Sequence, residues 1–255
     1  MGSCYRFDYC SSDTQNMMNY RTLRKSVLWA LLLISTLCYS QSVKTYIPPQ
    51  ALQFKGIYIL NQEQFFPRLD DPSYFMALTE HESCISLKHS KCWNASSKLQ
   101  SKRELGIGLS QLTKTYREDG TIRFDTLTEL RQRHKEHLSE LSWLTVEKRP
   151  DLQIKAMYLL TRDNYVRIVK AKTEDDRWFM TDAAYNAGYG SIQKRKTKCS
   201  LTKGCDPTVW EGNLAEHCPM SSKPLYGKRS ACEINNHHVY DVFYNRMPKY
   251  QRLFQ

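Results

Sequence analysis

A single glutamate falls among apolar residues in a segment whose pattern predicts a helix. Asp71-Pro72 is a helix-start signal, and Phe75, Leu78 and Glu82 then share one helical face. A carboxyl on the apolar face of a helix loses hydration, which disfavours its charged form, so we expect the pKa of Glu82 to be raised toward neutrality. Such a group can donate a proton at pH 7, as the leaving oxygen requires when a glycosidic bond breaks.

Neighbouring charged residues leave a second interpretation of Glu82 open. Glu80 would lie about 200° around the same helix and is expected to face solvent. His81 or Lys88 could form an ion pair with Glu82, in which case the carboxylate would serve the fold rather than chemistry. Position alone does not decide between a proton donor and a structural ion pair.

Three short motifs follow one another along the chain: Glu82-Ser83, GIGLSQ at residues 106–111 and AAYNAG at residues 183–188. The two glycines of GIGLSQ indicate a close approach of the backbone to another group. In order and character, the three motifs resemble those of the soluble lytic transglycosylase family, whose fold is similar to that of goose-type lysozyme. AAYNAG is the most specific of the three because it is an intact match.

The resemblance implies roles for six residues, each by its match to a motif of the family. Glu82 corresponds to the family's single catalytic acid. The implied substrate-binding residues are Ser83, Gln111, Tyr185, Asn186 and Tyr240. The resemblance implies no metal and no cofactor.

The implied reaction is cleavage of the β-1,4 bond between N-acetylmuramic acid and N-acetylglucosamine in the glycan strands of peptidoglycan. It would proceed without water and leave a 1,6-anhydro end. Glu82 would first protonate the leaving oxygen and then remove the proton from the C6 hydroxyl that attacks C1. One carboxylate would then suffice, which is an exception to the usual two-carboxylate arrangement.

Three other functions stay open. If Asp182 acted as a second carboxylate and positioned a water, the enzyme would be a hydrolytic muramidase, although a capping role or a contact with a basic residue is the favoured interpretation. A noncatalytic wall-binding component of a secretion or phage apparatus is the second. His237 and His238 beside Asn235 and Asn236 suggest a nuclease, but no acidic metal cluster accompanies them, so nucleic acid is not an expected partner.

Helical periodicity predicts the elements around these motifs. Apolar residues recur at helical spacing over residues 127–141, 154–168 and 179–186, and a last amphipathic run lies near residues 238–247. Residues 86–104 show no clear periodicity and are expected to form a loop.

The expected fold class is mainly α. A lysozyme-like helical transglycosylase core is predicted over residues 66–192, with a disulfide-braced, Cys-rich C-terminal extension over residues 193–255 packed on it. A separately folding second domain is disfavoured, because so short a segment would depend on its disulfides to stand alone. Residues 41–65 are expected to be a lead-in segment with a short strand at Gly56 to Leu60.

Residues 1–40 are expected to be an N-terminal tail followed by a signal peptide or a short membrane anchor. Val27 to Ser40 is an uncharged apolar run behind Arg21, Arg24 and Lys25. It is short for a membrane span, which needs about 20 residues, and suits the apolar part of a signal peptide. The protein is therefore expected to be exported, to the periplasm or cell envelope of a Gram-negative bacterium.

The charge balance indicates an anionic partner. The chain has 37 Lys and Arg against 26 Asp and Glu, a net charge of +11, of which +9 remains without residues 1–40. Peptidoglycan and its attached polymers carry negative charge, so glycan strands fit this balance, although scattered solvated charge would also produce it. An aromatic content of 12% excludes a disordered chain. The oligomeric state is not determined by these features.

Six cysteines follow residue 40, an even number that is typical of disulfides in an oxidising compartment. Six cysteines permit fifteen connectivities. We favour the three short loops, which join Cys84 to Cys92, Cys199 to Cys205 and Cys218 to Cys232. A zinc site remains an alternative, although no C-x-x-C pair is present. Its candidate ligands are Cys218, Cys232, His217, His237 and His238.

Overall fold

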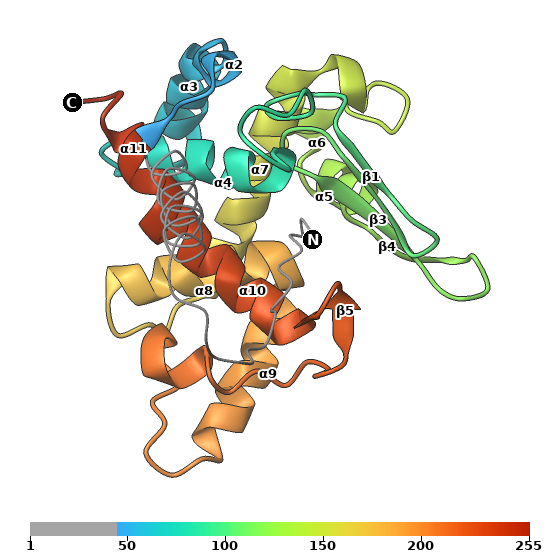
Figure 1. Cartoon of the computed structure of the whole chain (residues 1–255). Coiled ribbons are helices and arrows are strands. Elements are labelled where there is room, and N and C mark those ends of the chain that lie inside the picture. The colour runs from blue at the N-terminus through green and yellow to red at the C-terminus, as the bar shows by residue number, and fades with distance from the viewer. Residues whose placement is uncertain (1–44) are drawn as a thin grey trace, which may run out of the picture.

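The computed structural model describes residues 45–255 (Figure 1). The predicted tail and export segment, residues 1–40, lie outside these residues. Within residues 45–255, no helix is both long and apolar enough to cross a membrane.

The chain is mainly helical, as predicted, and also contains a four-stranded and a two-stranded sheet. The helices are α2 (Pro49–Leu52), α3 (Lys55–Phe65), α4 (Ser73–Ser83), α5 (Thr126–Arg133), α6 (Lys135–Leu138), η1 (Val146–Lys148), α7 (Pro150–Arg167), α8 (Glu174–Ala187), α9 (Tyr189–Ser200), η2 (Trp210–Leu214), α10 (Ala231–Tyr240), η3 (Asp241–Arg246) and α11 (Met247–Gln251). The strands are β1 (Lys98–Gln100), β2 (Glu104–Ile107), β3 (Leu112–Tyr116), β4 (Ile122–Asp125), β5 (Pro224–Tyr226) and β6 (Arg229–Ser230).

The predicted strand at Gly56 to Leu60 is wrong, because these residues belong to helix α3. Tyr58, Asn61, Gln62 and Phe65 of α3 are buried, at the spacing of one helical face. Two of these four residues are polar, so the spacing of the apolar residues alone does not show the helical period.

The predicted loop at residues 86–104 ends in strand β1 and the start of β2. Strands β1 to β4 form an antiparallel sheet in sequence order, with Gly106 opposite Thr113 and Ile107 opposite Leu112. The sheet lies beside the helical body (Figure 1). Its strands are short and largely polar, so they carry little of the apolar alternation that predicts a strand.

The predicted helices around the motifs are confirmed, with one break. Helix α7 covers the stripe at residues 154–168 up to Arg167, with Ile168 as its C-cap, and α8 covers residues 179–186. The run at residues 127–141 breaks at His134 between α5 and α6. Helix α4 begins one residue after Asp71-Pro72, where Asp71 Oδ1 accepts a hydrogen bond from the Ser73 N–H at 2.7 Å.

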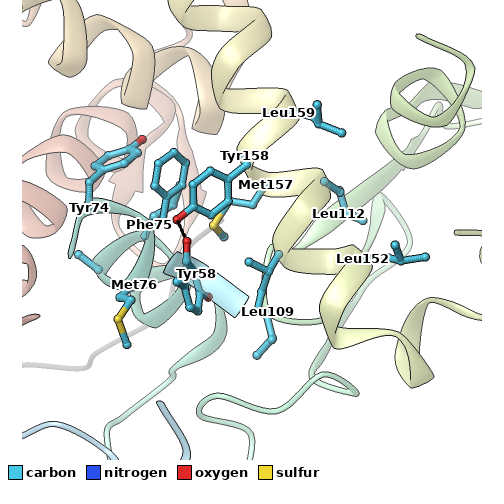
Figure 2. Packing of buried hydrophobic residues seen from close by; sticks show 14 of the residues in the cluster. Tyr58, Tyr74, Phe75, Met76, Leu109, Leu112, Leu152, Met157, Tyr158 and Leu159 are labelled. Carbon is cyan, nitrogen blue, oxygen red and sulfur yellow. Dashed lines mark hydrogen bonds between the residues drawn. The ribbon is translucent and has the colours of Figure 1, made fainter. Parts of the chain in front are cut away.

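Helices α3, α4 and α7 meet in an aromatic core (Figure 2). The rings of Phe75 and Tyr158 stack with centroids 3.6 Å apart, and the Tyr158 hydroxyl donates to the Tyr58 carbonyl at 2.9 Å. All three side chains are fully buried. This core fixes the axis of α4, the helix that carries Glu82.

The last part of the chain packs on the predicted core. Helix α10 packs against α8, while η3 and α11 pack against α4. Figure 1 shows α10 and α11 as one nearly continuous helix, joined by the π-helical segment η3 just before Pro248, a residue with no N–H to donate. The predicted boundary between residues 192 and 193 falls inside α9.

The three favoured disulfides are confirmed: Cys84–Cys92, Cys199–Cys205 and Cys218–Cys232. Pairing of Cys218 with Cys232 removes the two thiolates on which the alternative zinc site depended.

Replacing both Cys84 and Cys92 with serine is expected to lower the free energy of unfolding by about 2–3 kcal/mol, because the bridge closes a short loop and restricts the unfolded chain. The adjacent Trp93 is buried against Phe54, Tyr58 and Tyr250. Urea unfolding followed by tryptophan fluorescence measures the loss. A reducing agent should then lower the stability of the double variant by less than that of the wild type, because the variant has one disulfide fewer to break. An unchanged unfolding midpoint in the variant would contradict the prediction.

Candidate active site

A cavity of about 460 Å³ lies between the sheet and helices α4, α5, α7, α8 and α10. Its volume is in the usual range for a small-molecule site. Glu82, Gln111, Tyr185 and Asn186 all line it. The structure therefore brings together residues from all three sequence motifs, although Asn186 follows Glu82 by more than one hundred positions.

Glu82 is the second-last residue of α4, and its side chain is 7% exposed. His238 of α10 donates from Nε2 to Glu82 Oε1 at 2.8 Å and from Nδ1 to Asp182 Oδ2 at 2.7 Å. The Tyr74 hydroxyl donates to Asp182 Oδ1 at 3.1 Å. Glu82 is thus one end of a buried chain of four hydrogen-bonded side chains.

Glu82 and its hydrogen-bond partner His238 have opposite pKa shifts. Burial lowers the pKa of His238, but the charges and hydrogen bonds of Asp182 and Glu82 more than offset this and raise it to about 9. Burial raises the pKa of Glu82, but the hydrogen bond and positive charge of His238 hold it below its ordinary value. The predicted neutral Glu82 is therefore wrong: the carboxyl is desolvated as expected, but a buried cation keeps it ionised.

Tyr185 and Asn186 fix the end of α8 to its neighbours. The Tyr185 hydroxyl donates to the Ser110 carbonyl at 2.7 Å, which ties the AAYNAG motif to the GIGLSQ motif. Asn186 Oδ1 accepts from Asn235 Nδ2 of α10 at 3.0 Å. Both residues line the cavity while also holding its walls together.

The glycines of GIGLSQ allow the close approach that the sequence indicates. A Cβ at Gly106 would lie 2.7 Å from Gln111 Oε1, and one at Gly108, where φ is +84°, would lie 2.1 Å from Gln153 Oε1. Gln153 Oε1 accepts from the Leu109 N–H at 2.6 Å. The motif is therefore folded tightly against α7, and this places Gln111 at the cavity.

Two predicted substrate-binding residues lie outside the cavity. Ser83 is buried, and its Oγ donates to the Thr79 carbonyl at 2.8 Å and accepts from the Trp93 N–H at 3.2 Å, which makes it a brace for the loop after α4. Tyr240 is 55% exposed and packs against Tyr244. Neither lines the cavity that Glu82 faces.

Asp182 does not line the cavity either, and it contacts a basic residue, as the sequence favoured. Its partner His238 was considered only for a zinc or nuclease site. The role of His238 as a partner of Asp182 could have been predicted from its position on α10. Asn235, His238 and Val239 are buried on one face of this helix. Polar residues in a buried helical stripe need a partner inside the protein.

Glu80 is a further correction, because it is fully buried rather than facing solvent. Its Oε1 accepts from Lys249 Nζ at 2.6 Å and from Arg246 at 2.7 Å, and its Oε2 accepts from the Tyr250 hydroxyl at 2.5 Å. The side of α4 opposite the aromatic core is covered by η3 and α11, so neither side of this helix meets water.

Among the described residues, one group of side chains is close enough to hold a metal ion: Cys199, Cys205 and His217. The two cysteines are bonded to each other. Their sulfurs are therefore not thiolates, the form that binds metals.

The charge on His238 makes the stability depend on pH. Because its folded pKa is raised above 6.5 to about 9, its contribution to stability is complete below pH 6.5 and is lost as the pH rises through 9. We expect the free energy of unfolding to fall by the order of 3 kcal/mol over this interval. Urea unfolding at a series of pH values measures the fall.

The imidazole signals in NMR spectra provide the independent check. His238 should titrate near pH 9, whereas the neighbouring His81, whose ring lies 4.3 Å away, should stay neutral, because burial and the charge of His238 lower its pKa to about 3 against the opposing effect of Asp241. A His238 ring that titrates at or below pH 6.5 would contradict the assignment of its charge.

Models of known protein families, curated proteins and solved structures yield no match to this chain.

Proposed function

We propose that this protein is a lytic transglycosylase with a lysozyme-like core, and that it cleaves the bond between N-acetylmuramic acid and N-acetylglucosamine in peptidoglycan to leave 1,6-anhydro ends. The observation that carries the proposal is the cavity that Glu82 shares with Gln111, Tyr185 and Asn186. Three motifs that are distant in sequence were assigned to one site by resemblance, and a residue from each motif contacts this space or braces its wall.

In the proposed reaction, Glu82 acts as a carboxylate. The bond from C1 to the leaving oxygen breaks as the substrate's C6 oxygen bonds to C1, and Glu82 takes the proton that this hydroxyl releases. Its negative charge also favours the positive charge that develops at C1. His238 is a positioning residue, because its hydrogen bond holds the carboxylate in place and keeps it ionised until the proton arrives.

The leaving oxygen needs a proton from elsewhere. The resemblance assigned this step to Glu82, but in the free enzyme the pair it forms with His238 leaves Glu82 without the proton. The reaction therefore calls for a separate donor in the cavity, which is considered in the next section.

The charges and the cysteines support a polyanionic substrate outside the cytoplasm. Arg103, Arg133 and Arg167 line the cavity, and peptidoglycan strands carry carboxylates on their peptide stems. Three disulfides suit an oxidising compartment, so we propose the periplasm or cell envelope of a Gram-negative bacterium as the location. The segment at residues 27–40 is proposed as a signal peptide or anchor.

Mass spectrometry of the fragments released from purified peptidoglycan by residues 41–255 tests the proposal. Anhydro fragments, lighter than hydrolysis products by one molecule of water, are expected. Hydrated reducing ends would instead identify a hydrolytic muramidase acting at the same site. Binding to the wall without any release would indicate a noncatalytic component and would overturn the proposal.

A further inference from the structure

Glu104, the first residue of β2, is a second carboxylate that lines the cavity of Glu82. It is only 3% exposed. Its Oε1 is buried and has no hydrogen-bond partner within residues 45–255. Burial raises the pKa of this carboxyl, although the nearby Arg103 opposes the shift. A buried carboxyl oxygen without a partner is unusual, because burial removes it from water.

Other unpartnered polar atoms lie around the same cavity. Ser110 Oγ, Thr115 Oγ1 and Asn164 Nδ2 are also buried without a hydrogen-bond partner in the described part of the chain, and all three residues line the cavity together with Glu104. Thr115 is opposite Glu104 in the sheet. Buried polar atoms that gather in this way complement a ligand rich in hydroxyl and amide groups, as a sugar chain is.

The two carboxylates of the cavity have contrasting surroundings. Glu82 is hydrogen-bonded to a buried histidine, which favours its charged form. Oε1 of Glu104 is enclosed with no donor from residues 45–255, which favours a proton on this carboxyl. When two titratable groups in one site differ in this way, the charged one is suited to be the base and the neutral one the acid.

We propose that Glu104 is a further catalytic residue that donates the proton to the leaving glycosidic oxygen. This inference rests on the proposed function. As the bond from C1 to the leaving oxygen breaks, the proton on Glu104 moves to that oxygen, while Glu82 takes the proton of the attacking hydroxyl. The enzyme ends with its proton on Glu82 instead of Glu104, and exchange with water restores the starting state.

Replacement of Glu104 with glutamine tests the proposal on two substrates that differ in the leaving group. One is peptidoglycan, and the other is the 2,4-dinitrophenyl glycoside of the N-acetylglucosaminyl-N-acetylmuramic acid disaccharide, whose leaving group needs no proton. We expect Glu104→Gln to lose about 10²–10⁴-fold in kcat on peptidoglycan and less than about tenfold on the aryl glycoside. A merely structural residue would affect both substrates alike.

Three further variants make the result specific. Glu63→Gln, at an exposed position of α3 outside the cavity, should behave as wild type on both substrates. Glu82→Gln should lose activity on both, because the base is needed whatever the leaving group. Should Glu104→Gln fail to fold, as judged by thermal unfolding, Glu104→Asp keeps the acid with a shorter reach and should show the same dependence on the leaving group.

Two results would overturn the inference, and they are distinguishable. If the wild type cleaves peptidoglycan and the Glu104 variant is unaffected, or loses both activities equally, Glu104 is not the acid and the proposed function stands. If the wild type cleaves neither substrate, the proposed function is wrong, and the assignment of Glu104, which rests on it, is wrong as well.

Discussion

Replacing Glu82 with glutamine is expected to lower kcat for peptidoglycan cleavage by about 10³-fold. Glutamine keeps the size of the side chain and can still accept the hydrogen bond from His238, but it can neither take a proton nor oppose positive charge at C1. The rate at which soluble fragments appear from a peptidoglycan suspension measures the effect.

The variant should still bind the wall, since the other residues that line the cavity are unchanged. Sedimentation with insoluble peptidoglycan checks this, and Glu63→Gln, which removes one negative charge outside the cavity, serves as the control. If the Glu82→Gln protein retains more than about a tenth of the wild-type rate, the carboxylate of Glu82 does not take part in the reaction and the prediction is wrong.

Replacing Glu80 with leucine is expected to lower the free energy of unfolding by about 3–5 kcal/mol. Glu80 is the buried acceptor for Lys249, Arg246 and Tyr250. Without it, the fully buried ammonium of Lys249 keeps a single hydrogen bond within residues 45–255, to the Tyr46 carbonyl at 2.9 Å. Urea unfolding at pH 7 measures the loss.

A double variant, Glu80→Leu with Lys249→Met, separates the unpaired charge from the loss of packing. It should recover most of the stability, because Arg246 retains Asp241 and no buried ammonium is left without its carboxylate. Glu63→Leu, at an exposed position of α3, is the matched control and should change stability by less than about 0.5 kcal/mol. Equal losses in the single and double variants would show that the ion pair itself does not matter.

Local features of the chain predicted much of the fold. Helices α7 and α8 follow from their own apolar spacing, and the favoured disulfides join cysteines that are near in sequence. The sheet was missed because its strands are short and polar. Glu80 was misplaced because the helix that covers it lies 169 positions further along the chain at Lys249.

Part of the site was predicted from the motifs. Glu82 and the residues taken from GIGLSQ and AAYNAG reach the cavity, whereas Ser83 and Tyr240 do not. The charge state of Glu82 was wrong because it depends on His238, a long-range partner that periodicity around Glu82 cannot indicate. Glu104 carried no signal in the sequence, since only the folded sheet leaves its carboxyl enclosed.

The nearly continuous helix of α10, η3 and α11 supplies partners to both carboxylates of α4: His238 to Glu82, and Arg246, Lys249 and Tyr250 to Glu80. These partners leave the ribosome well after α4, since His238 follows Glu82 by 156 positions. A nascent chain that stops before α10 therefore lacks the groups that ionise and orient Glu82. On the proposed function, a fragment that ends before α10 is therefore expected to be inactive on peptidoglycan, even though it contains all three sequence motifs.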